Sequence, residues 1–293
     1  MRADTTPLKL VRAVADALET QSTVGGANIV LGVRPSIWAQ VASDQVPEHA
    51  ADFAAPLIGA EGFTMPATQQ DLWVWVAGTG RDLVFDVATD IVATLRPVAE
   101  PVTEVSGWSY RHSRDLTGFE DGTENPPLSR AADVAVVPAG RPGEGSSVVL
   151  VQQWVHQAQE WNSLDVATQE KVIGRTKADS IELDDNIQPA ESHVARTAIE
   201  DQNGDDLEVF RRNVPYGTVT EHGTMFVGFT SDPPPHEPNV ATDGRQRGRH
   251  PRRSHPLCHT ADRRLLRGAR HRGPARFHNT CRRIGHAGSS TSA

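Results

Sequence analysis

Apolar residues in the first hundred positions recur with two distinct periods. Apolar residues with helical spacing begin just after Thr6-Pro7, a pair typical of a helix start because threonine caps the helix and proline suits its first position. The same spacing returns between residues 81 and 96. Residues 29–33 and 72–76 are short apolar runs with β-branched or aromatic side chains, which are typical of central strands. A further strand is predicted at 102–105. The pattern therefore predicts the order helix, strand, strand, helix, strand.

A second unit is predicted from Ser106 onward. A polar, glycine-rich stretch leads into an apolar strand at 147–155, and helical and loop segments follow it. Two more strands are expected at 207–211 and 224–229, on either side of a turn at 213–217. Strands and helices mixed in both halves indicate an α+β protein.

The composition of the chain changes after Asp232, where a segment rich in arginine, histidine and proline begins. Together with the second unit that begins at Ser106, this change predicts domains at 1–105 and 106–232 and a tail at 233–293. The tail holds seven of the twelve histidines, thirteen arginines and only six large apolar side chains. Such a segment cannot bury enough surface to offset the entropy lost on ordering, so disorder is expected. A shift of reading frame near Asp232 in a GC-rich gene is an alternative origin for this composition.

Charge and cysteine content exclude several classes of protein. The net charge of −8 divides into +10 in the tail and −18 in the remainder, and such an acidic body argues against a specific nucleic acid partner. Both cysteines, Cys258 and Cys281, lie in the tail, which excludes a cysteine-ligated haem or an iron–sulfur cluster in the body. No apolar run reaches the roughly 20 residues of a membrane span, so a cytoplasmic protein is predicted. Zinc binding by His259, His278, Cys281 and His286 is an alternative role for the tail, although their spacing matches no finger pattern.

The first candidate functional segment surrounds Asp121. Residues 118–122 (GFEDG) place this carboxylate between glycines, whose backbone freedom would let the loop direct it into a cavity. An Asx turn that caps the loop is the alternative explanation.

Two further segments contain candidate residues. His193 follows a stretch dense in carboxylates; a lone imidazole is a common haem or metal ligand, and a surface or hydrogen-bonded core histidine is the alternative. Arg211, Arg212 and Asn213 lie at the end of a predicted strand. Neighbouring strand residues point to opposite faces, so only one arginine can face a given pocket. A solvated cationic patch, or an ion pair with the acidic body of the protein, is the alternative here.

Together these segments resemble the DyP-type (dye-decolorising) haem peroxidases. Four sequences occur in the order and approximate spacing of that family, and they are GFEDGTENP from Gly118, VIGRTKADSIELDDN from Val172, SHVAR around His193 and RRNVPYG from Arg211. The resemblance covers about residues 27–232. It implies two ferredoxin-like α+β domains, similar to the dimeric α/β-barrel, whose antiparallel sheets sandwich a haem b.

The resemblance also implies roles for individual residues. His193 would ligate the haem iron, and Asp121, Arg211 and Asn213 would lie on the peroxide side. Asp121 would move a proton between the two peroxide oxygens, while Arg211 would contact the haem and stabilise charge on the departing oxygen. A slip of one residue would exchange Arg211 and Arg212. A carboxylate base predicts activity that is strongest at mildly acidic pH.

The implied activity is reduction of hydrogen peroxide through a ferryl intermediate, with dyes, phenols or other small molecules as electron donors. The resemblance further implies a homo-oligomer, and some members of the family are packaged in a protein shell. Two alternatives stay open: a haem-binding or haem-transfer protein without turnover, and a haem-free remnant. The haem-free remnant is suggested by two departures from the family: no strand-like run precedes the helix that begins near Thr6, and the family pattern is lost soon after Phe229.

Overall fold

The computed structural model describes five stretches of the chain, residues 1–21, 26–58, 64–197, 208–233 and 258–260.

The described residues form two compact units. The first consists of Met1–Val33 and Asp71–Val105, and the second of Arg34–Gln70 and the residues from Ser106 onward. Residues 34–70 group with the second unit, although their position in the sequence assigns them to the first of the predicted domains.

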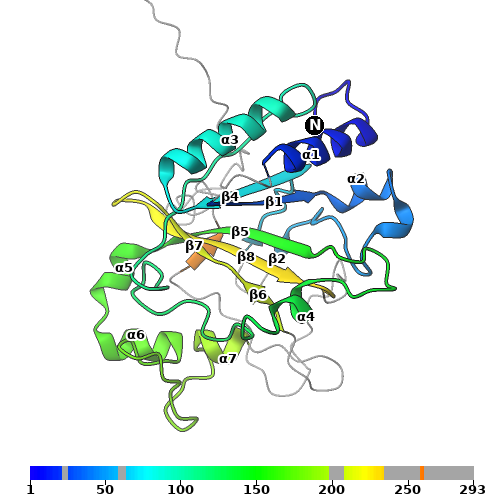
Figure 1. Cartoon of the computed structure of the whole chain (residues 1–293). Coiled ribbons are helices and arrows are strands. Elements are labelled where there is room, and N and C mark those ends of the chain that lie inside the picture. The colour runs from blue at the N-terminus through cyan, green and yellow to red at the C-terminus, as the bar shows by residue number, and fades with distance from the viewer. Residues whose placement is uncertain (22–25, 59–63, 198–207, 234–257, 261–293) are drawn as a thin grey trace, which may run out of the picture. The chain divides into compact units, whose positions relative to one another are not determined.

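The first unit is a pair of helices packed on a two-stranded antiparallel sheet. Helices α1 (Pro7–Gln21) and α3 (Arg81–Leu95) lie on the same side of strands β1 (Ala27–Val33) and β4 (Leu72–Gly78) (Figure 1). The buried apolar side chains of the two helices form the core, and they are Leu10, Val14, Ala17, Val87, Ile91 and Leu95. They recur every three or four positions, which is the period that predicts both helices from the sequence.

The second unit is built on an antiparallel sheet with the strand order β6-β8-β5-β9, in which β7 also pairs with β8. The long central strands are β5 (Val148–His156) and β8 (His222–Thr230), which run side by side (Figure 1). The shorter strands are β6 (Phe210–Arg211), β7 (Val214–Gly217) and β9 (Cys258–Thr260). Antiparallel sheets with helices in both units confirm the predicted α+β class.

The other elements of the second unit are short, and they are α2 (Pro35–Ala39), the 3₁₀ turn η1 (Ser43–Gln45), β2 (Leu57–Ile58), β3 (Thr64–Met65), α4 (Ala131–Ala135), α5 (Ala158–Ser163), α6 (Val166–Ile173) and α7 (His193–Thr197). Asp165 caps α6, because its side chain accepts a hydrogen bond from the N–H of Thr168 at 2.7 Å.

Trp161 connects these helices to the loop that precedes Asp121. It is 3% exposed, and its ring meets that of Phe119 edge to face with 5.8 Å between the ring centroids. Its Nε1–H donates to the carbonyl oxygen of Thr117 at 2.9 Å, and the side chain of Gln169 donates to the Trp161 carbonyl. The tryptophan therefore supplies both apolar burial and a hydrogen bond that fixes the loop.

We expect Trp161→Ala to lower the free energy of unfolding by about 3–5 kcal/mol, the usual cost of removing a buried aromatic side chain. Urea unfolding followed by circular dichroism measures this. Trp108→Ala is the matched control, because Trp108 is 42% exposed and its loss should cost less than about 1 kcal/mol. Equal losses in the two variants would contradict the role given to Trp161.

Three local predictions differ from the structure. The strand predicted at 102–105 is wrong, because these residues are mostly exposed and form no ladder with any described strand. The turn predicted at 213–217 is also wrong: β7 pairs with β8, and the turn lies at Thr218, whose N–H donates to Glu221 O at 2.7 Å. Pro215 fits in β7 because β8 is the only described strand that forms a ladder with it; on its other side Pro215 O accepts a hydrogen bond from Trp108 N–H at 3.2 Å, next to the isolated bridge between Gly107 and Tyr216. The strand predicted at 207–211 is reduced to β6, and Leu207 lies outside the described residues.

The predicted tail lies outside the described residues except for Pro233 and the strand β9, which pairs with β5. The same is true of His278, Cys281 and His286 as candidate zinc ligands, and of His259 only the backbone is described. Within the described part of the chain, no helix has both the length and the apolar character needed to cross a membrane.

Candidate functional site

Asp121 lies in a loop that two glycines shape. Gly118 and Gly122 have φ values of +90° and +82°, a region that other residues rarely adopt. The N–H of Asp115 donates to Phe119 O at 2.9 Å, and the N–H of Asp121 donates to Ser113 O at 2.8 Å. The glycines therefore have the special backbone conformation that their positions in the sequence predict.

Asn213 holds the carboxylate of Asp121. Its Nδ2 donates to Asp121 Oδ1 at 2.9 Å, and its Oδ1 accepts a hydrogen bond from the N–H of Val227 at 3.2 Å. Val227 belongs to β8 and is 3% exposed. The amide thus joins the carboxylate to the backbone of the central sheet, and both of its polar ends are satisfied.

Asn125 fixes the backbone of Arg211. Its Oδ1 accepts from the N–H of Arg211 at 2.7 Å, and its Nδ2 donates to the carbonyl oxygen of the same residue at 2.8 Å. Sequence reasoning gives Asn125 no role beyond its place in the GFEDGTENP segment. The residue type was the only indication in the sequence: a carboxamide side chain donates and accepts at once, so it can bond the N–H and the carbonyl oxygen of a strand residue as a neighbouring strand would.

The two adjacent arginines have different surroundings. Arg211 is half-buried and its charge acts on Asp121, whereas Arg212 is exposed. This difference agrees with the alternation of side chains along a strand. Of the two, Arg211 is the one that the structure brings to the carboxylate.

The pKa of Asp121 is raised above its ordinary value. Burial is the largest cause, and the neighbouring carboxylate of Asp115 adds to it. The hydrogen bond from Asn213, the charge of Arg211 and the N–H of Gly122 act in the opposite direction. The result is a carboxylate that accepts a proton more readily than an exposed one would.

Asp121→Asn should make the protein more stable at neutral pH. The folded pKa of Asp121 lies above its unfolded value, so the wild type loses stability as the pH rises through the folded pKa. The variant removes this loss, and its advantage in the free energy of unfolding should shrink below the unfolded pKa of about 4. Urea unfolding of both proteins from pH 3 to pH 8 measures the difference. A variant less stable than the wild type at pH 7 would contradict the burial argument.

His193 is the first residue of α7 and is exposed. The preceding Ser192 is 1% exposed, and its Oγ accepts from the N–H of Ala195 at 3.2 Å, which caps the helix. The structure therefore brings Asp121, Arg211 and Asn213 together, and it places His193 on a separate helix of the same unit.

Arg175 links the loop of Asp121 to the segment that leads to α7. Its guanidinium pairs with the carboxylates of Glu124 and Glu182 and donates to Ser180 O at 2.8 Å. Its Nε–H is buried and has no hydrogen-bond partner among the residues that the structure describes. Because buried donors are nearly always paired, this one is suited to an acceptor on a bound group.

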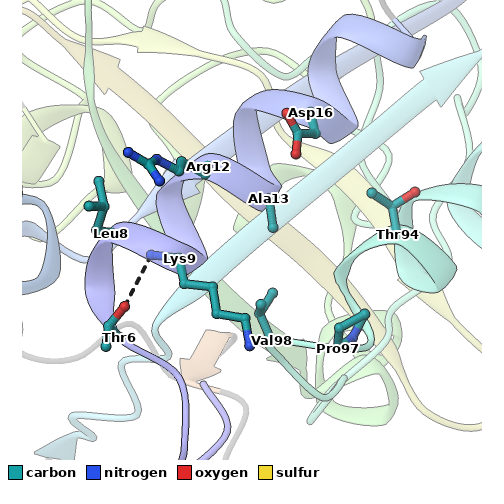
Figure 2. A pocket seen from close by; sticks show the side chains of 9 residues that line it. All are labelled: Thr6, Leu8, Lys9, Arg12, Ala13, Asp16, Thr94, Pro97 and Val98. Atoms are coloured by element: carbon teal, nitrogen blue, oxygen red, sulfur yellow. Dashed lines mark hydrogen bonds between the residues drawn. The ribbon is translucent and has the colours of Figure 1, made fainter.

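The first unit has a surface hollow of about 330 Å³ beside α1 and the C-terminal end of α3 (Figure 2). Basic and acidic side chains of α1 line it on one side, and Thr94 and Pro97 line it on the other. None of the predicted site residues lines this hollow.

Comparison with known proteins defines the class. The sequence pattern described as "Dyp-type peroxidase, N-terminal" matches residues 3–109, and that described as "Dyp-type peroxidase, C-terminal" matches residues 112–243. The chain belongs to the Dyp-type peroxidase family, which confirms the resemblance seen in its sequence.

Individual relatives support the same assignment. The Dye-decolorizing peroxidase of Rhodococcus erythropolis is 38% identical over 213 residues, which is 71% of this chain and 62% of the relative. The chain thus spans less than two thirds of that relative's length. DyPB from Rhodococcus jostii RHA1 has the same fold, with a TM-score of 0.71 at 35% identity over 80% of this chain and 78% of its own. For the encapsulated DyP-type peroxidase from Mycobacterium smegmatis the TM-score is 0.64 at 31% identity, over 77% and 74% of the two chains.

Proposed function

We propose that this chain is a haem peroxidase that reduces hydrogen peroxide and oxidises small electron donors such as phenols and dyes. The observation that carries the proposal is the cluster in which Asn213 holds Asp121 and the charge of Arg211 acts on it. Variants of the Rhodococcus jostii protein at one aspartate, one arginine and one asparagine are described as complexes with heme. That arginine and that asparagine are separated by a single residue, as Arg211 and Asn213 are here.

The residues present fit a haem b. His193 would supply the imidazole that ligates the iron, and the buried Nε–H of Arg175 is a donor of the kind that a propionate accepts from. Arg211 would contact the haem from the side of Asp121. When bound, the haem supplies an iron centre that takes up the oxidising equivalents of peroxide.

The side chains of the cluster perform the proton transfers. The ionised carboxylate of Asp121 accepts a proton from one oxygen of peroxide and returns it to the other as the O–O bond breaks, so that this second oxygen leaves as water. The guanidinium of Arg211 cannot deprotonate at working pH, so it stabilises the negative charge on the departing oxygen. Asn213 orients the carboxylate throughout. Because burial raises the pKa of Asp121, the acid limb of the activity should lie above the range of an ordinary carboxylate.

Haem reconstitution tests the proposal. The purified protein is titrated with haem, freed of excess haem by gel filtration, and then given peroxide with a phenolic donor. We expect a Soret band that peroxide shifts and donor oxidation well above that of the same concentration of free haem. A Soret band without donor oxidation would favour a haem-binding or haem-transfer protein, and no Soret band would favour a haem-free remnant.

We also propose a homo-oligomer in the cytoplasm that a protein shell can package. The encapsulated relative from Mycobacterium smegmatis supports the packaging; the homo-oligomer rests on the family resemblance, and the cytoplasmic location on the sequence alone. Neither nucleic acid nor a membrane is part of this proposal. Light scattering coupled to size-exclusion chromatography measures the oligomeric state directly.

A further inference from the structure

The second unit contains a cavity of about 550 Å³ at the start of the loop that leads to Asp121. Its lining includes four basic side chains, those of Arg111, His112, Arg114 and Lys177, and no aspartate or glutamate. The hollow of the first unit differs in this respect, because Asp16 lies among its basic residues. The lining of the larger cavity therefore favours an anion.

Two of the four basic side chains are already engaged by the protein. Arg114 donates to three backbone carbonyl oxygens, at 2.7 to 2.8 Å. The Nζ of Lys177 donates to the side chain of Gln169 at 2.6 Å and lies over the rings of Phe119 and Trp161. These contacts build the wall of the cavity and hold positive charge beside it.

Arg111 and His112 are engaged differently. Both side chains are exposed, and neither makes a hydrogen bond or an ion pair with any residue that the structure describes. The guanidinium of Arg111 lies 5.3 Å from the centre of the Tyr110 ring, which orients it without using its N–H groups. Within the part of the chain that the structure describes, no residue uses their side-chain donors.

The backbone that carries these two residues is strained. Arg111, His112 and Ser113 have φ values of 37°, 53° and 67°, so three successive residues other than glycine adopt the left-handed region. The run is held at its ends, where Arg114 N–H donates to Tyr110 O at 3.1 Å and Asp121 N–H donates to Ser113 O at 2.8 Å. Strain of this kind persists only where the surroundings enforce it, and it concentrates at ligand sites.

We propose that this cavity binds a small oxyanion, a carboxylate or a phosphate, through the N–H groups of Arg111 and His112. The site is separate from Asp121 but joined to it by the hydrogen bond to Ser113 O. The ligand would thus sit one backbone contact from the carboxylate of the candidate active site. The binding itself does not depend on haem or on peroxidase activity.

Titration of the full chain without added haem tests the proposal. Inorganic phosphate and benzoate are the probes, and the readouts are calorimetry and the backbone amide signals of the isotope-labelled protein. We expect saturable binding that shifts the amides of Arg111, His112 and Asp121. Tighter binding of benzoate would indicate an organic carboxylate as the ligand, and tighter binding of phosphate a phosphorylated one.

Asparagine variants separate ligand contacts from loop structure. Arg111→Asn and His112→Asn remove the basic groups, yet asparagine tolerates the left-handed conformation, so the loop should keep its shape. Each should weaken binding about tenfold, the effect of losing one charge-assisted hydrogen bond. Arg81→Asn, at an exposed arginine of α3, is the matched control and should leave affinity unchanged. Absence of saturable binding, or equal affinity in Arg111→Asn and the wild type, would overturn the proposal.

Discussion

His193→Ala should abolish stable haem binding. If His193 is the iron ligand, its removal leaves no imidazole at the N-terminus of α7 to hold the metal, and haem affinity should fall by more than about 100-fold, beyond the effect of losing a residue that only supports a ligand. The measurement is the Soret absorbance that remains with the protein after gel filtration of the reconstituted sample. Peroxide-dependent oxidation should disappear with it.

A second histidine and an added ligand make this test specific. His222→Ala, on β8, removes an imidazole elsewhere in the same unit and should keep the Soret band. Exogenous imidazole should restore part of the band to His193→Ala, because the side chain leaves a space of matching shape. Full haem retention by His193→Ala would mean that another residue ligates the iron.

Arg211→Gln should slow the reduction of peroxide by about 10²–10³-fold while haem remains bound, since a preorganised donor at developing charge contributes about 3–4 kcal/mol to a barrier. The fold should tolerate the change, because Asn125 bonds the main chain of Arg211 and not its side chain. Stopped-flow absorbance at increasing peroxide concentrations gives the second-order rate constant.

Arg212→Gln is the matched control for the same measurement. Arg212 is exposed, so its loss should change the rate constant by less than about twofold. A large effect at Arg212 with none at Arg211 would show that the strand presents the other face to peroxide. The pair of variants therefore decides between the two arginines that the sequence leaves open.

Elements with a clear period were predictable because they depend on local pattern. Helices α1 and α3 each bury one face, and β1, β4, β5 and β8 are apolar runs of the length that strands usually have. The strand predicted at 102–105 was wrong, because β-branched residues form a strand only where a partner strand is present, and a short run of them does not reveal a partner.

The candidate site divides in the same way. The segments that contain Asp121, His193 and Arg211 could be recognised as motifs in the sequence, and the family that they indicate is confirmed. The roles of these residues stay predictions. The contacts of the cluster could not be predicted, since Asn213 lies 92 positions from Asp121 and Asn125 lies 86 positions from Arg211.

The sequence by itself determined the family, the α+β class and the residue types of the site, because periodicity and short motifs are properties of neighbouring positions. Only the tertiary structure decided that β7 is a strand, that Arg211 is half-buried while Arg212 is exposed, and that burial raises the pKa of Asp121. Each of these depends on which distant segments exclude water from a given side chain. The local sequence pattern does not show which distant segments cover a side chain, whereas the packing of the folded chain does.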